Sequence, residues 1–256
     1  MMRQRRSVPA IAECLKQKTK KLLPTENEMT GIIAAMSCEA ELILNVMRDK
    51  SPRVICGITF WQGKIGNEDV VLATCGVGKV FAAACAVSMI MAYSPDRIIN
   101  TGVAGAVSGE VNKLDTVVGT ALVQHDMDTT PLGDEPGLIS GINKVYFETD
   151  RELSDELYRY VELCGGKAKR GIVATGDQFV ASAEVKRRIS TLFGASCADM
   201  EGGAIAHVCY INNVPFAALR TMSDGADGDA SGDFMEFCNK AAKISSDVII
   251  TYLSTK

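Results

Sequence analysis

The sequence has few histidines and lacks the paired cysteine motifs that are typical of zinc sites. It contains two histidines, His125 and His207, and nine cysteines without a CxxC pair. An odd number of thiols, mostly inside apolar runs such as "FAAACAVSMIM", is typical of reduced and buried cysteines. We therefore expect no zinc site and a reducing, cytoplasmic setting.

Long hydrophobic runs and a strong net charge are also absent, and aromatic residues are few. No apolar run reaches the roughly 18–20 residues that span a bilayer, so we expect no membrane partner. Aromatic residues make up 6% of the chain and the net charge is -4, which gives no reason to expect nucleic acid. The chain has 256 residues, 47% of them hydrophobic, and can form a sizeable core.

The first 28 residues, "MMRQRRSVPAIAECLKQKTKKLLPTENE", are basic and differ from the remainder. They lack the continuous apolar segment of a secretory signal. A transit-like peptide, an extra surface helix, a tag remnant and an upstream start codon all remain open. We place residues 1–28 outside the core and predict a single domain at 29–256.

From residue 29 onward, apolar strands alternate with helices, without a linker or repeat. This alternation predicts an α/β domain whose largely parallel or mixed sheet is covered on both faces. Asp150 and Ser182 are predicted helix caps. Strands are expected at 30–36, 54–76 (with a hairpin at "GKIGNED"), 96–102, 115–126, 169–175, 195–200 and 215–222, and helices at 38–49, 79–93, 150–165, 182–194, 201–213 and 233–256.

Ligands of α/β folds bind beyond the carboxyl ends of the strands, and few polar residues occur there. Three acids, Glu39, Glu201 and Asp224, lie at predicted strand ends, and Arg220 lies in the last strand. Such a set suits hydrolysis of a glycosidic bond. One acid protonates the leaving group, a second activates water and a third holds a sugar hydroxyl. The residues permit this chemistry without demanding it, because acids at these positions also cap helices.

Two glycine-rich segments need a separate test. "GVGKVF" (76–81) has Phe81 where a dinucleotide fingerprint needs a third glycine, and Val80 where a P-loop needs Ser or Thr. It is either a tight turn or a place where a ligand approaches the backbone. "INTGVAGA" (99–106) is likewise either a pocket wall or a packing turn.

Six motifs occur in order along the chain: "GIIAAMSCEAELI", "TCGVGKVFAAA", "RIINTGVAGAV", "ATGDQFV", "DMEGGAIAHVC" and "LRTMSDGAD". Together they resemble the 5′-methylthioadenosine/S-adenosylhomocysteine nucleosidases of the purine nucleoside phosphorylase superfamily, over about residues 30–254. The resemblance implies a three-layer α/β/α fold around a central twisted mixed sheet, usually in a homodimer. It also implies that water, without a cofactor, cleaves the bond between adenine and a 5′-alkylthio-ribose.

The resemblance assigns roles to individual residues. Glu39 would position the attacking water, and Asp224, oriented by Ser223, would protonate purine N7. Glu201 would accept the ribose hydroxyls. The implied substrate-binding residues are Met36, Val77, Ala104, Gly105, Phe179 (stacking on adenine), Val180 (reading its edge through the backbone), Met200 (on the sugar), Glu201, Arg220 (near the sugar), Ser223 and Phe234 (with Val77, along the tail).

Further expectations concern the neighbours of these residues. Burial should raise the pKa of Asp224, whereas Arg220 should keep Glu201 ionised. The two glycines after Glu201 should leave room for the sugar, and Asp199 and His207 are expected to be structural. The exposed loop 125–137 should lie near the partner's pocket, with Thr129 and Leu132 in place of the family's apolar residues.

Three other functions remain open. In a phosphorylase, phosphate would replace water, but Asn100 stands where those relatives carry an arginine. A hydrolase of another adenosine-like nucleoside, such as 6-amino-6-deoxyfutalosine, is a second possibility. A nucleoside-binding protein without catalysis is the third, and the presence of all three acids argues against it. A 5′-phosphate site, as in AMP nucleosidases, is not visible.

Overall fold

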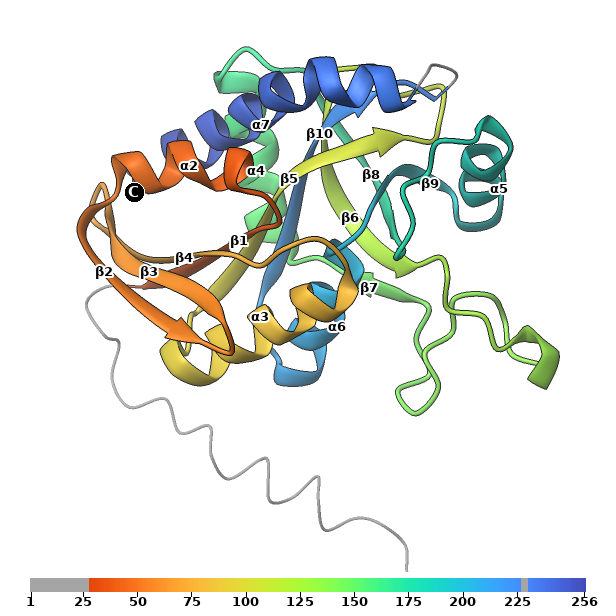
Figure 1. Ribbon diagram of the computed structural model, residues 1–256, viewed down its shortest axis with the longest axis horizontal. Helices are drawn as coiled ribbons and strands as arrows, with labels where there is room; N and C mark the ends of the chain where they lie inside the picture. The colour runs from red at the N-terminus through yellow and green to blue at the C-terminus, as the bar shows by residue number, and fades with distance from the viewer. Residues whose placement is uncertain (1–27, 227–229) are drawn as a thin grey trace, which may run out of the picture.

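The computed structural model describes residues 28–226 and 230–256. These residues form a 10-stranded mixed sheet with helices on both faces (Figure 1), which confirms the predicted α/β/α architecture. Nearly all of the predicted N-terminal extension lies outside the described residues, so its alternatives stay open.

The helices and strands follow the predicted order. Their bounds are β1 Met29–Ala34, α2 Ser37–Val46, β2 Arg48–Ile55, β3 Ile58–Ile65, β4 Glu68–Thr74, α3 Lys79–Tyr93, β5 Arg97–Ala106, β6 Thr116–Gln124, η1 Thr130–Leu132, β7 Tyr146–Glu148, α4 Arg151–Leu163, β8 Ala168–Thr175, α5 Ala183–Phe193, β9 Ala195–Asp199, α6 Gly202–Asn212, β10 Phe216–Asp224 and α7 Ala230–Ser254.

One part of the sheet closes on itself. Strand β10 pairs with both β5 and β6, and the path β10-β6-β8-β9-β5 returns to β10. The pairing of β5 with β9 is antiparallel and joins only their carboxyl ends, Gly105 with Ala198 and Ala106 with Cys197. Because β1, β5 and β10 are parallel, their carboxyl ends meet at the same edge, and the β5–β9 contact adds the end of β9.

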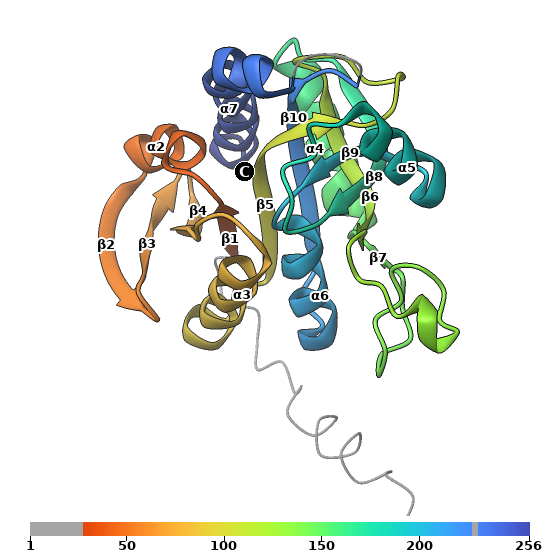
Figure 2. The ribbon, with the colours of Figure 1, turned by 45° about the vertical axis from the view of Figure 1, so that its right-hand side comes forward.

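Apolar side chains fill the space between the sheet and each helical layer. Helices α3 and α6 cover one face, and α2, α4 and α7 cover the other (Figures 1 and 2). Met89 of α3 and Ile205 of α6 belong to the first core cluster, and Ile43 of α2 and Tyr252 of α7 to the second. Among the described residues, no helix combines the length and apolar character needed to cross a membrane.

The structure corrects three sequence-based expectations. Strand β5 continues to Ala106, so "VAGA" belongs to a strand and is not a turn. Helix α2 ends at Val46, because β2 begins two residues later and pairs with β3. Strand β7 was not predicted, since its three residues are too few for a periodic pattern.

The two predicted helix caps differ. The Asp150 side chain accepts a hydrogen bond from the Leu153 N–H at 2.9 Å, which confirms it as the cap of α4. Ser182 occupies the N-cap position of α5, but its side chain makes no capping hydrogen bond. Only the first cap therefore satisfies an N–H group that the helix leaves without an intrahelical partner.

This difference predicts unequal costs of truncation. Asp150→Ala should lower the free energy of unfolding by about 1 kcal/mol. Ser182→Ala, the matched control, should change it by less than about 0.5 kcal/mol. Urea unfolding curves with an unchanged slope would measure both values. Equal losses in the two variants would contradict the assignment of the caps.

Candidate active site

A cavity of about 160 Å³ lies where the ends of β1, β5, β9 and β10 meet. Twelve of the thirteen predicted site residues line it, and Arg220 does not. The lining residues are Ala35, Met36, Glu39, Val77, Val103, Ala104, Gly105, Gln178, Phe179, Val180, Ala198, Asp199, Met200, Glu201, Ser223, Asp224 and Phe234. Sequence analysis missed Ala35, Val103, Gln178 and Ala198, and treated Asp199 as structural.

Backbone N–H groups hold Glu39 in the first turn of α2. The N–H groups of Ala35 and Met36 donate to Oε2 at 2.9 and 2.8 Å, and the N–H of Val103 donates to Oε1 at 2.9 Å. Burial raises the pKa of Glu39, although Arg220 acts in the opposite direction. A carboxylate has about four acceptor positions, so this fixed group retains one for a further donor.

Gly102 allows β5 to pass close to two charged side chains. A methyl group at this position would lie 2.5 Å from Glu39 Oε1 and 2.6 Å from Arg220 Nη1. Both separations are shorter than nonbonded carbon contacts allow. Residue 102 must therefore be glycine, because β5 passes close to the Glu39 carboxylate, which accepts the N–H of the next residue, Val103.

Glu201 lies at the junction of β9 and α6. Its Oε1 accepts the N–H of Gly78 at 2.9 Å, from the loop after β4. Burial, and next the charge of Asp199, raises the pKa of Glu201 to about 7 despite the opposing effect of Arg220. The expectation that Arg220 favours the ionised form of Glu201 is thus confirmed in direction, but burial and the charge of Asp199 outweigh it.

Glu201 is the N-cap residue of α6, but its side chain makes no capping hydrogen bond, and the Asp199 carboxylate binds the first turn instead. Its Oδ2 accepts the N–H of Gly202 at 2.9 Å and pairs with Arg220 Nη2 at 2.6 Å. Thr175 donates to Oδ1 at 2.5 Å, and Arg220 also donates to Asn100. Arg220 is 1% exposed. Arg220 is therefore buried behind the cavity wall. Contrary to the prediction that it binds substrate, it does not line the cavity.

The two glycines after Glu201 accommodate these buried groups. A methyl group at Gly202 would lie 2.5 Å from Asp199 Oδ2 and 2.7 Å from Leu122 Cδ2, and one at Gly203 would lie 2.9 Å from Thr175 Cβ. Neither glycine lines the cavity. The prediction that they leave room for a sugar is wrong.

A bulge at the end of β10 sets the position of Asp224. The pairing with β5 shifts register between Met222 and Asp224, and such bulges turn side chains out of the regular strand pattern. The Ser223 hydroxyl donates to Asp224 Oδ1 at 3.1 Å and lies 3.3 Å from the Ala104 carbonyl. The predicted contact between Ser223 and Asp224 is thus present.

Asp224 has a buried cationic neighbour that sequence analysis missed. Lys186 Nζ of α5 lies 2.6 Å from Asp224 Oδ2 and 2.6 Å from the Gly225 carbonyl. The two side chains are 2% and 3% exposed. The helical spacing could have identified Lys186 as buried. It lies at positions i, i+3 and i+7 with Ile189 and Phe193, on the buried face of α5.

Two aromatic rings stand together at the cavity. Phe179 and Phe234 pack edge to face, with ring centroids 5.6 Å apart and an interplanar angle of 83°. Phe179 is 48% exposed, so it is not a core residue. His207, by contrast, stacks on Phe147 at 5.0 Å, which confirms its packing role.

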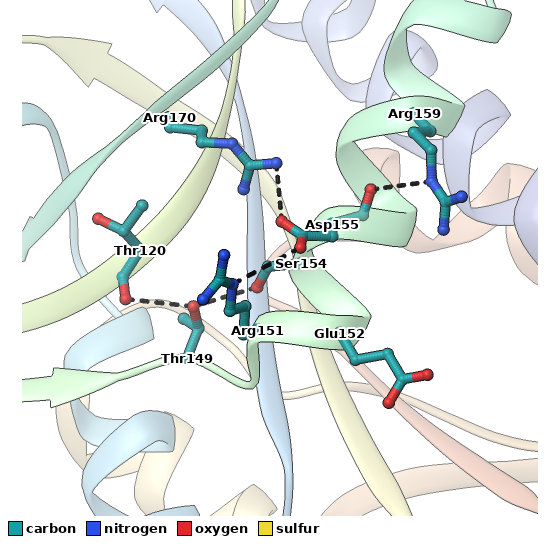
Figure 3. A pocket seen from close by; sticks show the side chains of 8 residues that line it. All are labelled: Thr120, Thr149, Arg151, Glu152, Ser154, Asp155, Arg159 and Arg170. Atoms are coloured by element: carbon teal, nitrogen blue, oxygen red, sulfur yellow. Dashed lines mark hydrogen bonds and ion pairs between the residues drawn. The ribbon is translucent and has the colours of Figure 1, made fainter.

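A larger hollow over α4 lacks this arrangement (Figure 3). Its lining is polar, and its carboxylate Asp155 is engaged by Arg170 at 2.8 Å and faces Arg151 at 3.9 Å. Arg151 is largely exposed. Charges that are paired and open to solvent in this way are ordinary surface features.

Comparisons with known proteins agree with the geometry. The model of the phosphorylase superfamily matches residues 30–254. The 5′-methylthioadenosine/S-adenosylhomocysteine nucleosidase of Haemophilus influenzae (strain PittEE) is 38% identical over 86% of this chain and 96% of its own length. That of Staphylococcus carnosus (strain TM300) is 36% identical over 89% of this chain and 100% of its own length.

Solved structures give the same result. A mutant of the Helicobacter pylori nucleosidase with 5′-methylthioadenosine in the active site has a TM-score of 0.86 and 31% identity, covering 90% of this chain and 100% of that one. Futalosine hydrolase of Helicobacter pylori has a TM-score of 0.85 and 31% identity, covering 90% and 98%. The chain therefore belongs to the phosphorylase superfamily and, within it, to the 5′-methylthioadenosine/S-adenosylhomocysteine nucleosidase family of N-glycosyl hydrolases.

Proposed function

We propose that this protein hydrolyses the N-glycosidic bond of 5′-methylthioadenosine and S-adenosylhomocysteine, and releases adenine and the 5′-thio-ribose. One observation carries the proposal. Glu39, Glu201 and Asp224 line one cavity, and none of the described residues that line it is a lysine or an arginine. Such a wall repels phosphate but suits water as the nucleophile and a sugar that becomes cationic in the transition state.

Glu39 is proposed as the group that positions and activates the water. Its raised pKa makes it a better proton acceptor, and its three backbone hydrogen bonds fix its orientation. The remaining acceptor position binds the water. As the water oxygen attacks the sugar C1′, its proton passes to Glu39.

Asp224 is proposed as the group through which the purine is protonated. Adenine is a poor leaving group as an anion, and a proton on N7 allows the bond electrons to move onto the base. The Ser223 hydroxyl supports this role, because it holds Asp224 Oδ1 in one orientation. Phe179 would stack on the adenine, and the backbone of Val180 would bind its edge.

Glu201 is proposed to accept the ribose hydroxyls and to stabilise the sugar cation. A pKa of about 7 allows it to exist in both protonation states near neutral pH. The positive charge that develops on the sugar favours the ionised state in the transition state, so the stabilisation grows as the reaction proceeds. Met200, its neighbour in the lining, would pack against the sugar.

The 5′ substituent is proposed to lie along the apolar lining residues Met36, Val77 and Phe234. These side chains suit a thioether tail and offer no charge to a 5′-phosphate. Asn100 is no phosphate ligand, since it lies buried and donates to the Ile33 carbonyl at 2.9 Å. A futalosine-type nucleoside remains a second candidate, because futalosine hydrolase has the same fold and a similar degree of identity.

The direct test is to assay adenine release in phosphate-free buffer. Methylthioadenosine, adenosylhomocysteine, a futalosine-type nucleoside and AMP should be compared by chromatography. We expect adenine from the two thioethers, at a kcat/KM that exceeds the value for AMP by at least about 100-fold. Formation of ribose 1-phosphates only when phosphate is added would contradict hydrolysis. Asp224→Asn, the catalytic control, should lower turnover by on the order of 10²–10⁴-fold while retaining inhibitor binding.

The pKa of Glu201 predicts a pH-dependent stability difference. The ordinary value of 4.5 rises to about 7 in the folded chain, so protonated Glu201 stabilises the fold below pH 4.5 and this contribution is lost as pH rises through 7. Glu201→Gln does not titrate. Its stability relative to the wild type should therefore increase by about 2 kcal/mol between pH 5 and pH 8. Urea unfolding at both pH values measures this change.

The matched control is the exposed acid Glu110. Glu110→Gln should show the same stability relative to the wild type at both pH values. A difference for Glu201→Gln that stays constant between pH 5 and pH 8 would contradict the raised pKa.

The molecule is also proposed to form a homodimer through α3. Val80 and Met91 are 80% and 76% exposed, and Phe81 is 56% exposed. Val77, which lines the cavity and lies just before α3, is also exposed. A second copy would cover this face and bring its 125–137 loop, with Leu132 82% exposed, toward the neighbouring cavity.

Sedimentation equilibrium tests the dimer. The wild type should sediment at about twice the chain mass of 27.4 kDa. Combining Val80→Asp with Met91→Asp should shift it toward the monomer, because charges cannot be buried unpaired in the interface. Val54→Asp, at an equally exposed apolar residue of the edge strand β2, should remain dimeric. A monomeric wild type would overturn the proposal.

A further inference from the structure

The contact between Lys186 and Asp224 conflicts with a simple donor role for Asp224. A carboxyl group donates a proton only when it holds one. An ammonium group at 2.6 Å stabilises the ionised carboxylate, which has no proton to give. The proton that reaches the purine must then come from another group next to Asp224.

Lys186 carries the nearest proton. Its Nζ has three protons, and two of its contacts are the Asp224 carboxylate and the Gly225 carbonyl. The side chain is buried, so water competes little for these protons.

Lys186 also contributes to a second opening, here called the outer opening. Ser108, Arg187, Ser190 and Thr191 line this opening with it. The opening and the cavity share no lining residue. Lys186 thus contributes to the outer opening and contacts the carboxyl group that faces the cavity.

We propose that Lys186 supplies the proton that Asp224 passes to the purine, an inference that rests on the proposed function. The proton moves from Nζ to Oδ2, leaving a neutral amine and a neutral acid. Rotation of the carboxyl group, whose χ2 torsion is soft, turns this oxygen toward the base. Asp224 then protonates N7, the C1′–N9 electron pair moves onto adenine, and water adds to C1′ while its proton goes to Glu39. The amine then takes up a proton from the solvent in the outer opening, and Glu39 releases its proton to solvent as the products leave, which restores both groups.

The relay explains why a lysine occupies this buried position. A purely structural partner for Asp224 needs only a positive charge or a hydrogen-bond donor, without access to solvent. A relay needs a donor that both releases and regains a proton, and a route for the regained proton that stays open while a ligand fills the cavity. Lys186 and the outer opening together meet these requirements.

Chemical rescue separates proton supply from charge. Lys186→Ala should lower adenine release by on the order of 10²–10⁴-fold. Methylammonium, which can enter through the outer opening, should then restore turnover by at least about tenfold. Tetramethylammonium carries the same charge but has no N–H proton and should not restore it. Arg188→Met, at an exposed residue of α5 that lines neither the cavity nor the outer opening, is the matched control and should keep wild-type turnover.

A second variant, Lys186→Arg, keeps the test valid if Lys186→Ala fails to fold. Lys186→Arg keeps the buried positive charge, but arginine does not release its proton in proteins. It should therefore retain inhibitor binding while its turnover stays as low as that of Lys186→Ala. Near wild-type turnover of Lys186→Arg, wild-type turnover of Lys186→Ala or equal rescue by both ammonium ions would overturn the relay. These outcomes leave adenine release by the wild type, and thus the proposed hydrolysis, unaffected.

Discussion

The buried ion pair between Arg220 and Asp199 is the interaction on which the site depends. Arg220 is 1% exposed and pairs with Asp199 at 2.6 Å, and its charge also acts on Glu39 and Glu201. Without Arg220, the carboxylates of Glu39, Asp199 and Glu201 would share one buried region without this counter-charge. Removing one partner of such a pair typically costs about 3–5 kcal/mol. The arginine therefore allows an acidic cavity to exist inside a stable fold.

The sheet determines where these charges meet. Strands β5 and β9 run in opposite directions, yet they pair at their carboxyl ends, which brings Glu201 beside the end of β5. The bulge in β10 turns Asp224 out of the regular strand pattern, and Gly102 lets Glu39 approach the strand from α2. Each acid is thus held by a different local irregularity at one edge of the sheet.

The positive and negative charges lie in separate layers. The acids line the cavity, whereas Arg220, which pairs with Asp199, and Lys186, which pairs with Asp224, do not. Carboxylates thus face the cavity, and their counter-charges do not line it. A cavity of this kind favours substrates that gain positive charge during the reaction, as in glycosidic cleavage.

The sequence by itself determined the α/β order and the acids at the strand ends, because hydrophobic periodicity and strand-end position are local properties of the chain. It also located the cap at Asp150 and the packing of His207. Only the tertiary structure decided which groups serve each acid. Arg220 forms its ion pair with Asp199, 21 residues earlier, and not with Glu201. Lys186 of helix α5 forms an ion pair with Asp224 of strand β10. The pairing of β9 with β5 and the packing of α5 determine these partners. Both bring together residues that are distant in the sequence, so no short-range sequence pattern indicates the contacts.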